Sequence, residues 1–282
     1  MFELGIEILP YRDFNFETAL KEISALGYKW VNLWSSKAPL PHHVNPGDNP
    51  KEVLSLLRKY DLKPSALSIY VLNLEETKER IELAEQLGIS TVIFHCQTYY
   101  DDFVQSFIPP VLDFAKKHGV RIAVENQISV PFTENFQSEG HGQTYCEAGV
   151  DTLAQIDRLI TEINDPNLGI CLAPAHLWVL GETISQVINH LMERKKLFFY
   201  YAWDISRNYS REKDGLNFGS THDQLPRADG TLDHAVLFKT LNLAGYDGIV
   251  SLCSHATEGW SLEKVTSELA ISTKYLQKCI EK

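Results

Sequence analysis

Apolar residues along this chain follow two alternating spacings. Short apolar runs recur, and several of them end in a polar residue. Between the runs, apolar residues follow the i, i+3, i+4 spacing of an amphipathic helix. The short runs predict buried strands over Phe2–Leu9, Tyr28–Leu33, Leu62–Ser68, Thr91–His95, Arg121–Glu125, Leu168–Leu172, Leu197–Asp204 and Gly248–Cys253. The helical spacing is found over Phe16–Leu26, Leu54–Tyr60, Glu75–Leu87, Phe107–Lys117, Leu153–Ile163 and Val236–Leu243.

Strands that alternate with helices are typical of an α/β protein with a parallel sheet. Eight such strands in one chain predict a closed (β/α)8 barrel, the TIM barrel. A barrel of this kind takes about 250 residues, so the 282 residues predict a single domain over residues 1–282. Gly88 and Gly119 stand where a helix turns into a strand, and we expect both in the left-handed conformation that ends helices.

The charge and the apolar content of the chain argue against two classes of protein, nucleic-acid-binding and membrane-spanning proteins. The formal net charge is −11 and no basic stripe is present, so we expect no nucleic-acid partner. No uncharged apolar run reaches about 18 residues, so we expect no membrane span. The chain enters its first predicted strand without a basic region, and its five cysteines are scattered without a CxxC pair. We therefore expect a cytoplasmic protein with a small-molecule substrate, and the oligomeric state stays open.

Long polar segments follow three of the predicted strands. They cover Ser35–Pro50, Asn126–Val150 and Ser206–Gly230, and connections beyond about 12–15 residues in a compact domain are usually functional. Because each follows a strand, all three are expected at the carboxyl end of the barrel, where such barrels have their active sites. In the last segment, Arg207 and His222 are predicted to contact the substrate.

Polar side chains at strand ends are the candidates for catalysis. Glu125 closes an apolar run, so its carboxylate is expected to be buried unless a partner satisfies it. It is predicted to be a general base or a metal ligand, and a buried structural salt bridge is the alternative. His95 ends another strand and His176 follows the sixth. Both are predicted to be catalytic, with hydrogen bonding to the backbone as the alternative.

Aromatic residues gather near the same strand ends. Trp34, Tyr201 and Trp203 are close to the ends of predicted strands, and Asp204 follows directly. Aromatic faces suit sugar rings and flat cyclic molecules, whereas the alternative is that these rings fill the top of the barrel. We predict that Trp34, Tyr201, Trp203 and Asp204 bind the substrate.

Several phrases of the sequence resemble the xylose-isomerase-like barrels, the superfamily of sugar phosphate isomerases and epimerases. The resemblance covers nearly the whole chain and implies a TIM barrel that acts on small carbohydrates. It also implies a divalent metal held by Glu, Asp, His and Glu on strands five to eight. The phrases that carry the resemblance are Gly5–Ile8, Ala25–Tyr28, Val92–His95, Ile122–Asn126, Leu168–Leu172 and Ala244–Leu252.

The implied metal ligands are only partly present. The first Glu falls on Glu125 and a histidine falls on His176, but the Asp falls on Ala173. The strand-seven histidine falls on Tyr201 and the last Glu on Cys253. Magnesium and manganese prefer oxygen ligands, so the usual ligand set is incomplete and the cofactor stays unknown.

Two replacement sites stay open at this point. Cys253 and His255, with the histidine and glutamate named above, are candidates for a softer zinc site. Alternatively, His222 or Asp223 in the long loop supplies the missing ligand.

The leading functional hypothesis is a sugar phosphate isomerase- or epimerase-like protein, or a dehydratase, that removes a proton next to a carbonyl of a small carbohydrate or cyclic polyol. The alternative is a catalytically degenerate family member that binds or senses a small molecule without the usual metal. Endonuclease-like cleavage needs several zinc ligands that this sequence lacks. No GxSxG, P-loop, GxGxxG or HExxH motif is present either.

Overall fold

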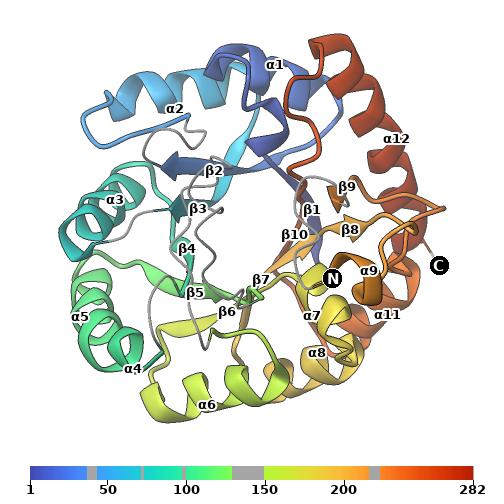
Figure 1. Ribbon diagram of the computed structural model, residues 1–282. Helices are drawn as coiled ribbons and strands as arrows, with labels where there is room; N and C mark the ends of the chain where they lie inside the picture. Colours follow the sequence, from blue (N-terminus) through green and yellow to red (C-terminus); the bar gives the residue numbers. More distant parts are fainter. Residues whose placement is uncertain (37–42, 71–72, 97–99, 129–148, 216–222, 282) are drawn as a thin grey trace.

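A computed structural model describes residues 1–36, 43–70, 73–96, 100–128, 149–215 and 223–281. At its centre, parallel strands close into a barrel in the order β1-β10-β7-β6-β5-β4-β3-β2 (Figure 1). The predicted (β/α)8 barrel is therefore confirmed. The barrel strands are β1 (Glu3–Glu7), β2 (Trp30–Ser36), β3 (Lys63–Tyr70), β4 (Thr91–His95), β5 (Arg121–Glu125), β6 (Leu168–Leu172), β7 (Leu197–Ala202) and β10 (Ile249–Leu252).

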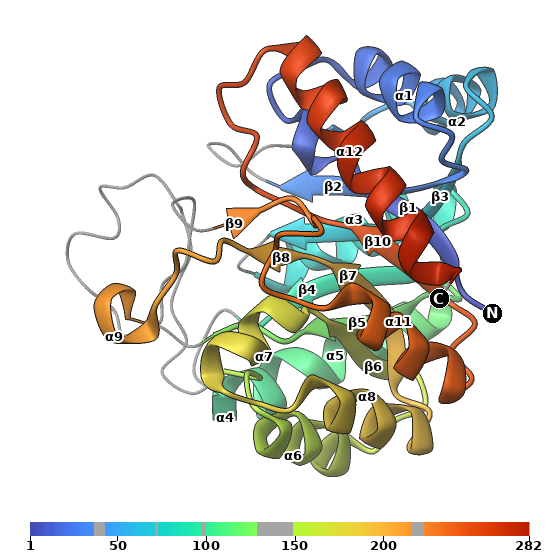
Figure 2. The ribbon, with the colours of Figure 1, turned by 90° about the vertical axis from the view of Figure 1, so that its right-hand side faces the viewer.

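Helices surround the barrel on the outside (Figure 1). Their apolar faces pack against the outer face of the strands in one large cluster of buried residues. They are α1 (Phe16–Ala25), α2 (Pro50–Lys59), α3 (Leu74–Gln86), α4 (Tyr100–Asp102), α5 (Ile108–Lys117), α6 (Leu153–Ile163), α7 (Pro174–Leu180), α8 (Ile184–Glu193), α11 (His234–Leu243) and α12 (Leu262–Ile280). The short helix α9 (Arg211–Asp214) has no buried residue and lies away from the barrel (Figure 2). A 3-10 turn covers Leu9–Tyr11, and a π-helical turn covers Phe103–Phe107.

The helix ends follow the local chemistry of the sequence. The side chain of Asn15 accepts a hydrogen bond from the Thr18 amide at 2.9 Å and so caps α1. Gly88 and Gly119 have φ values of +69° and +66°, which confirms the predicted left-handed helix ends. Among the described residues, no helix is long and apolar enough to cross a membrane.

The predicted strand Leu197–Asp204 is wrong at its carboxyl end. The barrel strand β7 stops at Ala202, whose register partner is Leu252 of β10. Asp204 belongs instead to β8 (Asp204–Ile205), which pairs antiparallel with β9 (Asp223–Gln224). The apolar pattern does not reveal this break because the residues on both sides of it are buried. The sequence pattern also missed α7, α8 and α12.

All carboxyl ends of the barrel strands lie on one side of the molecule. Figure 2 shows this side at the left, with β8, β9 and α9 beside it, and both chain termini at the opposite end. The inner face of the barrel carries a second buried cluster that includes Ala66, Ile93, Ala123, Cys171 and Phe199. Above this apolar filling, polar side chains form the mouth of the barrel, where catalytic residues lie in folds of this class.

Gly169 of β6 is a position where the barrel tolerates no side chain. A Cβ built at this residue would lie 2.5 Å from the Cγ of Phe198 in the next strand, and that atom cannot swing away. We expect Gly169→Ala to lower the free energy of unfolding by about 2 kcal/mol through overpacking. Chemical denaturation measures this loss. In the Phe198→Ala background the same substitution should cost much less, and an equal cost in both backgrounds would contradict the steric explanation.

Candidate active site

Glu125 is the last residue of β5, at the mouth of the barrel. Its register neighbours are His95 on β4 and Cys171 on β6. The side chain is buried, and burial, together with the charge of Glu7, raises the pKa of this carboxyl well above its ordinary value. Within the described part of the chain, no hydrogen bond or ion pair to the Glu125 carboxylate is found. The alternative of a structural salt bridge therefore has no support among these residues, and the group is a strong base once ionised.

Glu7 is a second buried carboxyl at the mouth, and the sequence analysis did not select it. It ends β1, and its Oε1 accepts hydrogen bonds from the indole nitrogen of Trp34 and from Asn32 Nδ2 at 3.4 Å. Cys253 and Tyr201 lie close enough to this side chain to favour its charged form. Burial is the main cause that raises the pKa of Glu7 to about 7, against the lowering effect of these polar neighbours.

A hydrogen-bonded network of neutral groups lies beside Glu7. Asn32 Nδ2 donates to Ser68 Oγ at 2.9 Å and to the Tyr201 hydroxyl at 3.2 Å. Ser68 Oγ and the Tyr201 hydroxyl are 2.8 Å apart. Tyr201, predicted to bind substrate, therefore uses its hydroxyl to hold the wall of the barrel around Glu7.

His95, the register neighbour of Glu125, and His176 are buried imidazoles at the mouth. Burial lowers the pKa of each imidazole to about 3, and the charge of His95 adds to the effect on His176. Both rings are therefore neutral at physiological pH. The amide of Ile128 lies 3.5 Å from Nδ1 of His176. A neutral imidazole can donate a hydrogen bond to a developing oxyanion, so these histidines suit the stabilisation of an enolate.

Asn126 fixes the segment that carries His176. Its side chain accepts a hydrogen bond from the Ala173 amide at 2.7 Å and donates one to the Ala173 carbonyl at 3.0 Å. Ala173 is the N-cap residue of α7, and His176 lies in the first turn of this short helix. The residue after Glu125 thus sets the position of His176, which couples the two predicted catalytic residues through the backbone.

Aromatic rings form a continuous row along one side of the mouth. The ring of Trp34 lies 5.9 Å from that of His255, which lies 5.4 Å from that of Trp203. Trp203 in turn makes an edge contact with His176 at 5.0 Å. The structure therefore brings three residues from different parts of the chain into one surface, with His176 at its end.

Asp223 holds this aromatic row in place. Its buried carboxylate accepts hydrogen bonds from Trp203 Nε1 at 2.7 Å, from Ser254 Oγ at 3.1 Å and from the His255 amide. Burial raises the pKa of Asp223 to about 6, although these bonds act in the opposite direction. Asp223 is therefore fully engaged with protein donors, which argues against its use as a replacement metal ligand.

We expect Asp223→Ala to lower the free energy of unfolding by about 2 kcal/mol, because it leaves buried donors without an acceptor. The substitution should also raise hydrogen exchange around Trp203 and His255. Asp229→Ala is the matched control, since Asp229 is exposed on the same segment. Equal stability losses in both variants, measured by denaturant titration, would contradict the bracing role.

Two predicted substrate contacts lie outside this cluster. Asp204 Oδ1 accepts hydrogen bonds from the amides of Ile205, Thr231 and Leu232. Arg207 donates from Nε to the Gly230 carbonyl at 2.9 Å. In the described residues, both side chains thus brace the turn that follows β9 and do not join the group around Glu125. His222 lies outside the described residues.

The residues present do not fit the four-ligand metal site that the resemblance implies. Among the described residues, no group of three or more His, Cys, Asp or Glu side chains is arranged to hold a metal ion. Ala173 offers no donor, and the Tyr201 hydroxyl is engaged with Ser68 and Asn32. Burial raises the pKa of the Cys253 thiol well above its ordinary value.

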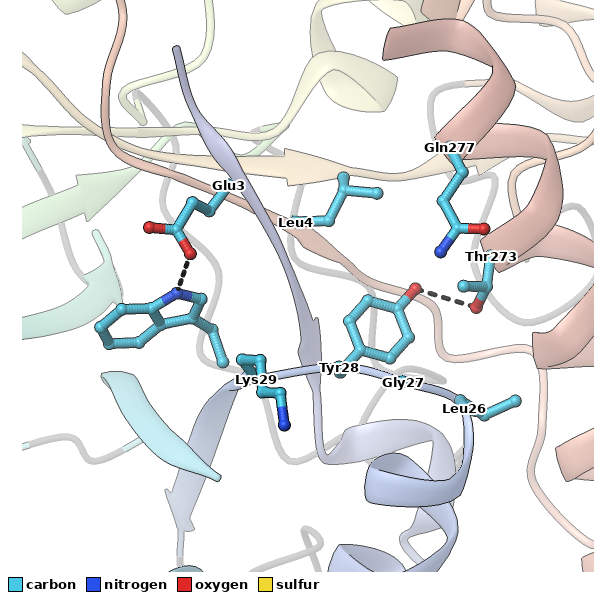
Figure 3. A pocket seen from close by; sticks show the side chains of 9 residues that line it. Glu3, Leu4, Leu26, Gly27, Tyr28, Lys29, Thr273 and Gln277 are labelled. Carbon is cyan, nitrogen blue, oxygen red and sulfur yellow. Dashed lines mark hydrogen bonds between the residues drawn. The ribbon is translucent and has the colours of Figure 1, made fainter. Parts of the chain in front are cut away.

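A cavity of about 210 Å³ at the opposite end of the barrel is not part of this cluster (Figure 3). Its polar groups bind one another: Glu3 accepts a hydrogen bond from Trp30 Nε1 at 2.6 Å, and the hydroxyls of Tyr28 and Thr273 are 2.9 Å apart. The mouth, with its buried acids and neutral imidazoles, is therefore the better candidate for an active site.

The closed parallel barrel defines the class of this protein, a (β/α)8 barrel with polar side chains at its strand ends. Residues 20–276 match the xylose isomerase-like TIM barrel family, so the chain belongs to this family.

Known proteins resemble the chain at low identity. Inosose isomerase of Bacillus subtilis (strain 168) is 24% identical over 199 residues, which cover 70% of this chain and 64% of that protein. The match thus spans less than two thirds of this relative. The IOLI protein, solved with a bound zinc atom, has a TM-score of 0.74 at 19% identity, covering 99% of this chain and 98% of its own. L-ribulose 3-epimerase has a TM-score of 0.71 at 15% identity, and the match covers 100% of this chain and 95% of the epimerase chain.

Proposed function

We propose that this protein isomerises or epimerises a small carbohydrate or cyclic keto-polyol by removing a proton next to a carbonyl. The observation that carries the proposal is Glu125, a buried carboxyl with a raised pKa that lies between strands carrying His95 and Cys171. A carboxylate in such surroundings is a stronger base than one in water. The family membership and the similarity to inosose isomerase support the choice of substrate class.

In the proposed reaction, the Glu125 carboxylate accepts the proton from the carbon next to the substrate carbonyl. The electron pair of that C–H bond becomes the double bond of an enolate, and charge develops on the carbonyl oxygen. His95 and His176, both neutral, donate hydrogen bonds to this oxygen. The row of rings formed by Trp34, His255 and Trp203 lies along the apolar face of the sugar. In isomerisation, Glu125 returns the proton to the former carbonyl carbon while a proton passes from the neighbouring hydroxyl to the carbonyl oxygen. In epimerisation, the same carbon takes a proton from the opposite face.

Exchange with solvent deuterium tests this function directly. The purified protein is incubated in D₂O with an inosose or with L-ribulose, and the sugars are followed by NMR. We expect deuterium to enter the carbon next to the carbonyl, together with formation of the isomer or epimer. Exchange no faster than in the absence of protein, with both sugars, would contradict the proposed function.

The second candidate is a binding or regulatory module without catalysis. It is favoured by Ala173, Tyr201 and Cys253, which stand at the positions of implied metal ligands. Calorimetric binding of the inosose without any deuterium exchange would support this candidate over the enzyme.

A further inference from the structure

Glu7 and Glu125 end strands on opposite sides of the barrel. In the closed order, β1 and β5 are separated by β10, β7 and β6 on one side and by β2, β3 and β4 on the other. Each glutamate is the last residue of its strand, and each side chain is buried at the mouth. A molecule bound at the centre of the mouth therefore lies between the two carboxyls.

The Glu7 carboxyl is only half satisfied. Its Oε1 takes the hydrogen bonds from Trp34 and Asn32, whereas Oε2 is buried and has no hydrogen-bond partner among the described residues. An unsatisfied buried oxygen is costly, and native structures rarely keep one without a reason. The donors on Oε1 hold the carboxyl in one orientation, and Oε2 stays without a hydrogen bond among the described residues, with the Cys253 and Tyr201 side chains close to the carboxyl.

We propose that Glu7 is a second catalytic residue, which exchanges a proton with the substrate from the side opposite Glu125. The inference rests on the function proposed above. It adds the acid that an epimerisation needs, because inversion at a carbon requires a proton donor on the face opposite the base. A single base can remove a proton and return it only to the face from which it came. Inversion at the same carbon needs an acid on the other face.

The proton count of the step is balanced. The step starts from the single-proton form of the pair in which Glu125 is the carboxylate and Glu7 is the neutral acid. Glu125 takes the proton from the carbon, the C–H electron pair passes into the enolate, and the enolate carbon then takes the Glu7 proton from the opposite face as the carbonyl re-forms. Afterwards Glu125 is neutral and Glu7 is ionised, so the enzyme is poised for the reverse direction until the two exchange protons with water.

The two carboxyls are electrostatically coupled. The charge of Glu7 raises the pKa of Glu125, so ionisation of one carboxyl disfavours ionisation of the other. Such a pair holds one proton over a wide pH range, as an acid and base in one site require. The step needs no lysine or arginine, because the proton passes between the two carboxyls and the substrate alone.

The test compares Glu7→Gln with Glu3→Gln, in which the same change is made at the far end of the same strand. With L-ribulose in D₂O, we expect Glu7→Gln to form the epimer at least about 100-fold more slowly, with KM within about threefold of wild type. Deuterium should still enter the recovered L-ribulose, because Glu125 remains. Glu3→Gln should behave as wild type, and Glu7→Asp should recover part of the epimer formation.

Each outcome decides a different claim. Epimer formation by Glu7→Gln at the wild-type rate, in an enzyme that is active, would overturn the role of Glu7 alone. Loss of deuterium exchange and epimer formation together in a folded Glu7→Gln variant would also overturn it, because Glu125 would then not act independently. A wild-type protein without any exchange would overturn the proposed function and the role of Glu7 with it.

Discussion

Glu125→Gln is expected to lower kcat for isomerisation of the true sugar substrate by about 10³-fold, with a much smaller change in KM. The amide keeps the shape of the side chain but cannot accept a proton from carbon, and positioned general bases contribute about 10²- to 10⁴-fold. Deuterium exchange into the substrate should fall by a similar factor. Steady-state kinetics and exchange by NMR measure the two quantities.

The control for this substitution is Glu263→Gln, at an exposed glutamate in the first turn of α12. It should leave activity unchanged. In the wild type, kcat/KM should rise with pH through the raised pKa of Glu125, because only the carboxylate is a base. If Glu125→Gln retained more than about a tenth of wild-type kcat, another residue would have to be the base.

Glu7→Gln is expected to make the protein more resistant to unfolding at alkaline pH. Folding raises the pKa of Glu7 from its ordinary value of 4.5 to about 7. Between these values the folded state binds more protons than the unfolded state, so stability falls as pH rises and stays lower above pH 7. The difference between the two pKa values corresponds to about 3 kcal/mol.

The quantity to measure is the difference in unfolding free energy between Glu7→Gln and wild type, by urea titration at several pH values. This difference should increase by about 3 kcal/mol from pH 4 to pH 8, because glutamine does not titrate. Glu3→Gln, at the other end of the same strand, should show no such increase. A difference that is independent of pH would mean that Glu7 ionises in the folded protein as easily as in the unfolded chain.

The fold, and the choice of Glu125 and His95 as candidate site residues, follow from local sequence patterns. Glu125 was recognisable because a carboxylate closes an apolar run, and the position of His95 one strand earlier gave the same signal. Glu7 lies in a similar run, Leu4–Leu9, but the pattern there continues past the acid with two further apolar residues. Nothing in that run marks the end of the strand at Glu7, so its place at the mouth emerged only with the structure.

Contacts between distant segments explain the other differences. Asp204 looks like the end of a strand, yet its role follows from the antiparallel pairing of β8 with β9 and from the amides of the turn after β9. Trp34 and Trp203 were predicted as separate aromatic contacts and His255 as a candidate metal ligand, and their order along one row depends on how the barrel closes. Periodicity carries no information about such pairings, because it describes only neighbours along the chain.

The barrel closes where β1 pairs with β10. The surroundings of Glu7, at the end of β1, are therefore complete only after β10 has been synthesised. β1 is synthesised before its partner β10 and before β7, the strand that carries Tyr201. Until then, one edge of β1 has no partner strand, and the acid at its end stays hydrated and ionised. Such distant pairings slow folding and leave sheet edges open to other chains. The surroundings of the residue that we assign to catalysis are thus completed only when β10 closes the barrel against β1.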